Sequence, residues 1–130
     1  MSEKMNENTN ALNWFEIPAT DIQRAAKFYE AIFDIKMFQM EMMGMKMAMF
    51  PTNAQSGKSG GGLCQSEMHV PSKTGSFIYL NANPDLQLVI DRIEENGGKI
   101  VMPKTSIGEN GFMGFFEDCE GNVVGLHSTK

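Results

Sequence analysis

Residues 13–33, NWFEIPATDIQRAAKFYEAIF, place a short strand directly before an amphipathic helix. In the strand, Phe15 and Ile17 alternate with Trp14 and Glu16. Because successive side chains of a strand point to opposite faces, the alternation predicts one face for Phe15 and Ile17 and the other for Trp14 and Glu16. The rest of the chain is organised around this unit.

The helix that follows has a start signal and a buried stripe. Pro18 cannot donate a hydrogen bond to a sheet and is expected to end the strand. Thr20 and Gln23 have the spacing of a capping box, and Asp21 suits the positive end of the helix. Apolar residues then recur at helical spacing and predict the buried face: Ile22, Ala25, Ala26, Tyr29, Ile32 and Phe33.

Length and composition limit the class of protein. A chain of 130 residues with 42% hydrophobic and 21% charged residues fits a single soluble domain, here residues 11–130. The net charge of -5, without a Lys/Arg cluster, argues against a nucleic-acid partner. No apolar run is long enough to span a membrane. The polar residues 1–10 predict a disordered arm without a signal peptide, and two cysteines favour a reduced, cytoplasmic setting.

The plan of strand, helix and three strands occurs twice. We expect one module at 13–64, a linker at 65–75 and a second module at 76–128. Aligning Trp14 with Phe77 gives a repeat offset of 63 residues (77 − 14 = 63). The strands of the first module are expected at 14–17, 34–43, 45–50 and 61–64. Those of the second are expected at 76–81, 99–102, 112–117 and 123–127, with a helix beginning near 83–85 and a loop at 103–111. The fold class is therefore α+β, with two βαβββ modules.

Two segments resemble the vicinal-oxygen-chelate superfamily, and within it the small glyoxalase/bleomycin-resistance-like proteins. They are EIPATDIQRAAKFYEAIF (16–33) and GFMGFFEDCEGNVVGLHS (111–128). The turn at 118–122 is similar to the family's D-P-x-G-N, with Cys119 where proline is usual. The resemblance implies that each module forms a curved sheet and that the sheets together cup a ligand. It also implies a divalent metal held by His and Glu side chains of equivalent strands.

The metal ligands of this family do not carry over. The first-strand ligand aligns with Trp14, its counterpart in the second module with Phe77, and the last-strand glutamate with Gly125. The fourth position falls within 61–64, where no carboxylate or imidazole occurs. Divalent metals need nitrogen, oxygen or sulfur donors, which indole, phenyl and hydrogen do not supply. We therefore expect no metal at the family's usual site and no cofactor.

Apolar candidates for the ligand cup come from both modules. Trp14, Phe77 and Tyr79 are expected to form an aromatic wall, although plain core packing explains such residues equally well. Met47 lies in a methionine-rich strand whose flexible side chains suit a ligand, a soft core or a subunit interface. Gly125 marks the site of the lost glutamate and joins the candidate ligand-binding residues.

Two titratable residues are candidates for acid–base chemistry. Glu16 shares a face with Trp14 and could act as a base or a polar anchor, or could simply form a salt bridge at the rim. His127 lies beside the lost glutamate position, or is solvated near the C-terminal tail. His69, in the linker, is expected to be solvent-exposed. Cys64 and Cys119 have no evident activating base, and we interpret both as structural.

Three functions remain open. The first is a metal-free protein that binds a small apolar or aromatic molecule, as bleomycin-resistance relatives do. The second is a metal-dependent lyase or isomerase resembling glyoxalase I, a lactoylglutathione lyase, with unidentified ligands. The third is a non-catalytic module for a protein partner. The resemblance also implies a homodimer, because relatives commonly pair modules across chains.

Overall fold

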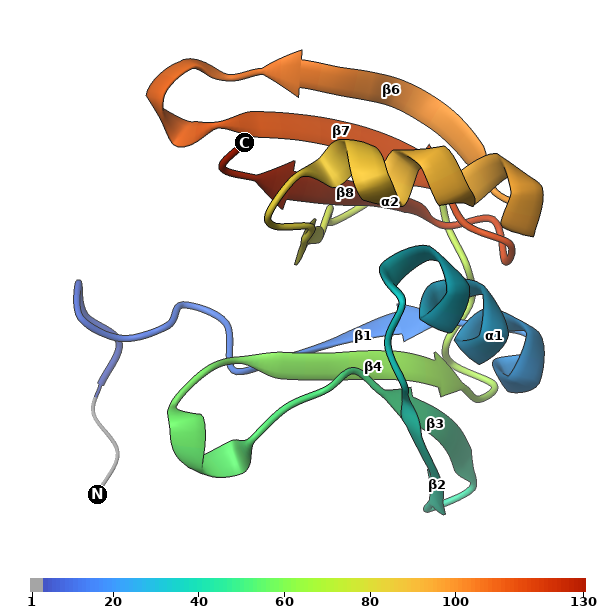
Figure 1. The fold of residues 1–130 in the computed structure, drawn as a ribbon. Coiled ribbons are helices and arrows are strands. Elements are labelled where there is room, and N and C mark those ends of the chain that lie inside the picture. The colour runs from blue at the N-terminus through green and yellow to red at the C-terminus, as the bar shows by residue number, and fades with distance from the viewer. Residues whose placement is uncertain (1–3) are drawn as a thin grey trace.

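The computed structural model describes residues 4–130 and contains two four-stranded mixed sheets, each with one α-helix (Figure 1). This confirms the α+β class. The strand orders are β1-β4-β3-β2 and β5-β8-β7-β6, with β1–β4 and β5–β8 parallel and the other pairs antiparallel. The first module comprises β1 (Trp14–Pro18), α1 (Ile22–Phe33), β2 (Phe38–Met42), β3 (Met45–Met49) and β4 (Gly60–Gln65). The second comprises β5 (Tyr79–Asn81), α2 (Leu86–Ile93), β6 (Lys99–Ser106), β7 (Phe112–Glu117) and β8 (Val123–Ser128).

Both helices lie between the two sheets (Figure 1). The core is continuous across this layer, since the rings of Phe28 on α1 and Phe116 on β7 have centroids 6.1 Å apart. Each sheet therefore turns its helix-covered face inward and its other face outward. The two outer faces belong to different sheets and do not turn toward each other, so one chain does not form the cup that the resemblance implied from both sheets.

The alternation predicted for β1 is confirmed. Ile17 is 2% exposed and belongs to the core, whereas Trp14 is 39% exposed on the outer face. The register continues across the sheet, because Ile17 pairs with Leu63 and Leu63 pairs with Ala48, all three of them buried. Side chains that pair across strands share a face, so the inner face of the first sheet is a uniform apolar layer under α1.

Helix α1 begins one residue later than the capping box predicted. Asp21, not Thr20, is the N-cap residue, and its carboxylate accepts a hydrogen bond from the Arg24 amide at 3.1 Å. The amides of Thr20 and Asp21 donate instead to Glu120, a residue of the second module. The charged acceptor from outside the helix therefore replaces the local capping box.

Several predicted boundaries were wrong. The strand expected at 99–102 continues to Ser106, so 103–106 is not loop. Pro103 is tolerated because β6 is the edge strand of its sheet and its register shifts between Met102 and Thr105. Strand β5 covers only Tyr79–Asn81 rather than 76–81, and β2 begins at Phe38 rather than near 34. Of the predicted disordered arm, residues 1–3 lie outside the described residues.

The turn between β7 and β8 ties the second module to the first. The Tyr29 hydroxyl donates to the buried Asp118 carboxylate at 2.8 Å, and the Asn122 side-chain amide donates to the carbonyl of Pro18 at 2.7 Å. Glu120 accepts from Arg24 at 2.6 Å. We call Arg24, Tyr29, Asp118, Glu120 and Asn122 the inter-module clasp. It fixes the orientation of the two modules.

Candidate functional site

The outer face of the first sheet is rich in methionine. The pairing of Trp14 with Gly60, Glu16 with Gly62 and Met47 with Cys64 places these residues on the side away from α1. The exposed apolar residues on this side include Phe38 at 67% and Met42 at 42%. We call this surface the methionine face: Trp14, Glu16, Phe38, Met40, Met42, Met45, Met47, Met49, Gly62 and Cys64.

The outer face of the second sheet is aromatic. The ring of Phe115 lies 5.5 Å from that of Phe77 and 5.3 Å from that of Tyr79, centroid to centroid. Phe77 and Tyr79 are about half exposed, at 51% and 49%. We call this surface the aromatic face: Phe77, Tyr79, Met102, Met113, Phe115, Gly125 and His127.

The predicted site residues divide between these faces. Trp14, Glu16 and Met47 lie on the methionine face, with Met47 buried at 3% exposure. The predicted wall of Trp14, Phe77 and Tyr79 is not formed by one face of a single chain, because Trp14 lies on the outer face of the first sheet and the other two lie on that of the second. Phe115 completes the aromatic cluster in its place. The alternation along its strand indicates the face on which Phe115 lies. Its pairing with Gly125 depends on the tertiary fold and has no local signal in the sequence.

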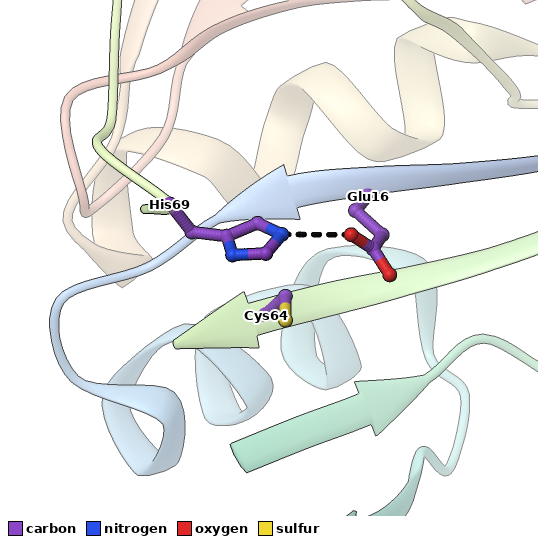
Figure 2. A group of neighbouring side chains, drawn as sticks. All are labelled: Glu16, Cys64 and His69. Atoms are coloured by element: carbon purple, nitrogen blue, oxygen red, sulfur yellow. Dashed lines mark hydrogen bonds and ion pairs between the residues drawn. The ribbon is translucent and has the colours of Figure 1, made fainter. Parts of the chain in front are cut away.

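Glu16 is held by two neighbours rather than by Lys or Arg. His69 Nε2 lies 2.7 Å from Glu16 Oε1, and Trp14 Nε1 donates to Glu16 Oε2 at 3.2 Å (Figure 2). His69 Nδ1 in turn lies 2.6 Å from Ser66 Oγ. With its side chain 11% exposed, His69 is not the solvated linker residue that the sequence predicted. Its separation of 53 positions from Glu16 left no local signal.

Both cysteines are protonated thiols in their present surroundings. Burial, and then the charge of Glu16, raises the pKa of Cys64. Burial, followed by the hydrogen bond to Glu120, raises the pKa of Cys119 to about 12. Since the thiolate is the nucleophile, neither residue is activated as it stands. The acidic neighbours Glu120 and Asp118 also raise the pKa of Cys119, and burial contributes more than either.

His127 is anchored at one end of the aromatic face. Its Nε2 donates to the carbonyl of Asn110 at 2.7 Å. Together with Tyr79, Ile107 and Met113 it lines a cavity of about 440 Å³. This cavity brings together two of the predicted site residues, His127 and Tyr79.

Gly125 has a packing role on this face. A Cβ atom placed on Gly125 would lie 2.7 Å from Cδ2 of Tyr79, well inside van der Waals contact. The Tyr79 ring therefore rests directly on the glycine backbone. The absence of a side chain at Gly125 is thus coupled to the position of an aromatic ring.

The residues aligned with the family's metal ligands do not fit a metal. Trp14 and Phe77 offer no lone pair to a cation, and Gly125 has no side chain. They are also split between the two outer faces of the chain. No chemical step through such a metal can be derived from these positions.

Comparison with known proteins identifies relatives. The sequence profile of the Glyoxalase/Bleomycin resistance protein/Dioxygenase superfamily matches residues 11–126. A glyoxylase-like domain-containing protein of Didymella fabae is 36% identical over 118 residues, covering 86% of this chain and 88% of that protein. No α-helix among residues 4–130 is long and apolar enough to cross a membrane.

Solved structures share the fold. The hypothetical protein SA1046 from S. aureus aligns with a TM-score of 0.64 at 20% identity, covering 95% of this chain and 99% of that one. A glyoxalase I mutant from Zea mays aligns with a TM-score of 0.65 at 20% identity. The alignment covers 89% of this chain but only 46% of the maize chain, so this chain spans less than half of that protein.

Proposed function

The chain belongs to the Glyoxalase/Bleomycin resistance protein/Dioxygenase superfamily, and on this premise we propose that it is a cytoplasmic, homodimeric protein that binds a small apolar or aromatic molecule without the family's usual metal. The observation that carries the proposal is the pair of apolar faces, one on the outer side of each sheet. Exposed apolar clusters of this kind mark binding surfaces.

A second copy of the chain is the proposed occupant of each face. The helices α1 and α2 separate the two faces, and the inter-module clasp holds them apart. A two-fold dimer can set the methionine face of each chain against the aromatic face of the other. Both faces are then covered at once, and two equivalent cups are formed. Flexible methionines opposite fixed aromatic rings suit an adaptable apolar site.

The aromatic face favours a flat apolar ligand. The cluster of Phe77, Tyr79 and Phe115 offers ring faces for stacking, and the adjoining cavity of about 440 Å³ suits a small molecule. The cavity is also lined by the polar residues Asn81, Asn83 and His127, which can hydrogen-bond a ligand. The Tyr79 hydroxyl and the free ring nitrogen Nδ1 of His127 are the proposed polar contacts.

Glu16 would face the same cup as the partner subunit's His127. Its carboxylate is already oriented by His69 and Trp14, and its side chain is 30% exposed. A preoriented carboxylate is a suitable anchor for a donor group on the ligand. We assign Glu16 this binding role, and acid–base chemistry would require the ligand to present a transferable proton to it.

Sedimentation combined with a thermal-shift screen tests the proposal. We expect the wild type to be a dimer, and Phe38→Lys on the methionine face and Phe77→Lys on the aromatic face each to yield monomers. Met43→Lys is the matched control, because Met43 is 90% exposed in the β2–β3 turn and belongs to neither face. Small aromatic compounds should raise the melting temperature of the wild type and the control only.

A wild type that remains monomeric at high micromolar concentration would contradict the dimer. Equal stabilisation of wild type and Phe77→Lys by every aromatic compound that binds would contradict the proposed site. Sedimentation thus tests dimer formation, and the thermal shift tests ligand binding.

A further inference from the structure

Three potential metal ligands converge on the methionine face. The side-chain donor atoms of Glu16, Cys64 and His69 all lie within 4.8 Å of one another. Figure 2 shows the imidazole of His69 and the carboxylate of Glu16 together on the side of β4 where Cys64 lies. They come from β1, from β4 and from the segment that follows β4. Their meeting is therefore a product of the tertiary fold.

The spacing suits one small transition-metal ion. Zinc bonds of about 2.0–2.3 Å place tetrahedral ligand atoms roughly 3.3–3.8 Å apart. Glu16 and His69 are closer than this at 2.7 Å, and no pair within the group exceeds 4.8 Å. A shared ion would require Glu16 Oε1 and His69 Nε2 to move apart from their present 2.7 Å.

The donor types favour a borderline or soft ion. Imidazole nitrogen, carboxylate oxygen and cysteine sulfur are the ligands that zinc takes in proteins. The Met45 thioether, 3.8 Å from Cys64 Sγ, adds a further soft group to the surroundings. Hard ions such as magnesium prefer all-oxygen sites, which this group does not provide.

Hydrogen bonds outside the group hold two of the donors in place. Ser66 Oγ lies 2.6 Å from His69 Nδ1, so the hydroxyl can accept the Nδ1 proton and leave Nε2 free for a metal. Trp14 Nε1 holds the second oxygen of Glu16 at 3.2 Å. Outer partners of this kind orient ligands and strengthen metal binding.

A metal at this position would bind the Cys64 thiolate and an unprotonated nitrogen of His69, because only these forms offer a free lone pair to the ion. The ion would lie next to Glu16 Oε1 and His69 Nε2, which are 2.7 Å apart. Its positive charge would stabilise the thiolate and the carboxylate together.

We propose that Glu16, Cys64 and His69 form a zinc site with one open coordination position. The site differs from the family's, whose first-strand position is Trp14. It also has no counterpart on the aromatic face, where the positions equivalent to Glu16 and Cys64 hold Tyr79 and His127. The inference does not rest on the proposed organic ligand.

Cobalt(II) titration of reduced, tag-free, metal-stripped protein tests the site. We expect one cobalt per chain, a thiolate-to-cobalt charge-transfer band in the near ultraviolet, and displacement of the cobalt by zinc. Cys119→Ser is the matched control and should keep the band and the stoichiometry. Cys64→Ser, close in volume to the native residue, should lose the band.

Substitutions outside the buried core distinguish the loss of a metal ligand from misfolding. His69→Gln lies in the segment between strands and should weaken zinc binding at least as much as Ser66→Ala, for which an outer partner predicts roughly a 10-fold to 100-fold loss. A wild type without a stoichiometric cobalt band would overturn the proposal. Zinc affinity unchanged in both Cys64→Ser and His69→Gln would also overturn it.

Discussion

The two modules have the same inner faces and different outer ones. Along β1 and β5 the buried residues match at the 63-residue offset, since Leu80 replaces Ile17 (80 − 17 = 63) and Ala82 replaces Ala19. At the same offset on the outer faces, Tyr79 stands for Glu16 and His127 for Cys64. The inner faces, which pack under a helix, have the same apolar pattern in both modules. The outer faces carry different functional groups.

The modules also differ in their turns. The turn after β7 carries Asp118, Glu120 and Asn122, which reach into the first module. The position 63 residues before Asp118 is Gln55, an exposed residue of a short 3-10 turn. Only the turn of the second module therefore supplies residues to the clasp, and the following predictions exploit this asymmetry.

The largest effect is expected at Asp118. This buried carboxylate accepts hydrogen bonds from the Tyr29 hydroxyl and from the amides of Glu120 and Asn122. Asp118→Ala leaves these donors unpaired and should lower the free energy of unfolding by about 3–4 kcal/mol. Gln55→Ala should change it by less than about 0.5 kcal/mol. Urea denaturation measures both, and similar losses would show that the turns are energetically equivalent.

The next effect is a pH dependence from Glu120. Burial alone would raise the pKa of this carboxyl, but hydrogen bonds from Arg24, Thr20 and Asp21 lower it to about 2 from a usual 4.5. A folded pKa below the unfolded one stabilises the protein above about pH 4.5, and this contribution disappears as the pH falls toward 2. Because Arg24 is half exposed, we expect about 2 kcal/mol.

Glu120→Gln provides the measurement. The variant should be less stable than the wild type at pH 7, and the difference should close between pH 4.5 and pH 2. Urea unfolding across this range follows both proteins. A constant difference at every pH would assign the effect to packing rather than to the charge.

A smaller effect separates two equivalent glycines. A Cβ atom on Gly62 would lie 2.7 Å from the backbone oxygen of Ala48, whereas one on Gly125 would meet the Tyr79 ring at 2.7 Å. Backbone yields less readily than a half-exposed ring, so Gly62→Ala should cost about 2 kcal/mol and Gly125→Ala about 1 kcal/mol. In a Tyr79→Ala background the cost of Gly125→Ala should vanish. A double-mutant cycle by thermal unfolding tests this coupling.

The smallest effect compares the polar ends of Glu16 and Tyr79. Glu16→Gln keeps the shape of the side chain and much of its hydrogen bonding, so it should cost less than about 1 kcal/mol. Tyr79→Phe should cost almost nothing, because the Tyr79 hydroxyl has no hydrogen-bond partner within residues 4–130. Aromatic compounds should nevertheless give altered thermal-shift profiles with both variants. Profiles identical to wild type would remove both residues from the proposed cup.

Short-range patterns were sufficient for most of the fold. The alternation of Phe15 and Ile17 with Trp14 and Glu16 correctly separated the inner face from the outer one, because a strand has only two faces. The boundaries failed where tertiary context decides: Pro103 would end an interior strand but is accommodated at an edge with a shifted register. Thr20 has the residue type and spacing of an N-cap, but its backbone amide donates to Glu120, a charged acceptor 100 positions away.

The candidate site was harder to predict because it depends on how distant segments meet. Nothing local to His69 indicates that it reaches Glu16, and Cys64 has no adjacent ligand in the sequence. The orientation of the modules depends on the clasp between Tyr29 and Asp118, 89 positions apart. Sequence patterns assign a residue to a face, but they do not show which way the two faces point.

In the proposed dimer a single chain would be an incomplete receptor, because each cup takes one face from each chain. Each chain would contribute one half to each of two equivalent cups, and only two chains together would complete either. The concentration of complete sites would then rise with the square of the protein concentration when dimers are scarce. Dilution would abolish binding faster than it removes protein, and any compound that bridges the halves would itself promote pairing. Expression level would thus set a threshold for function, as it does for a switch.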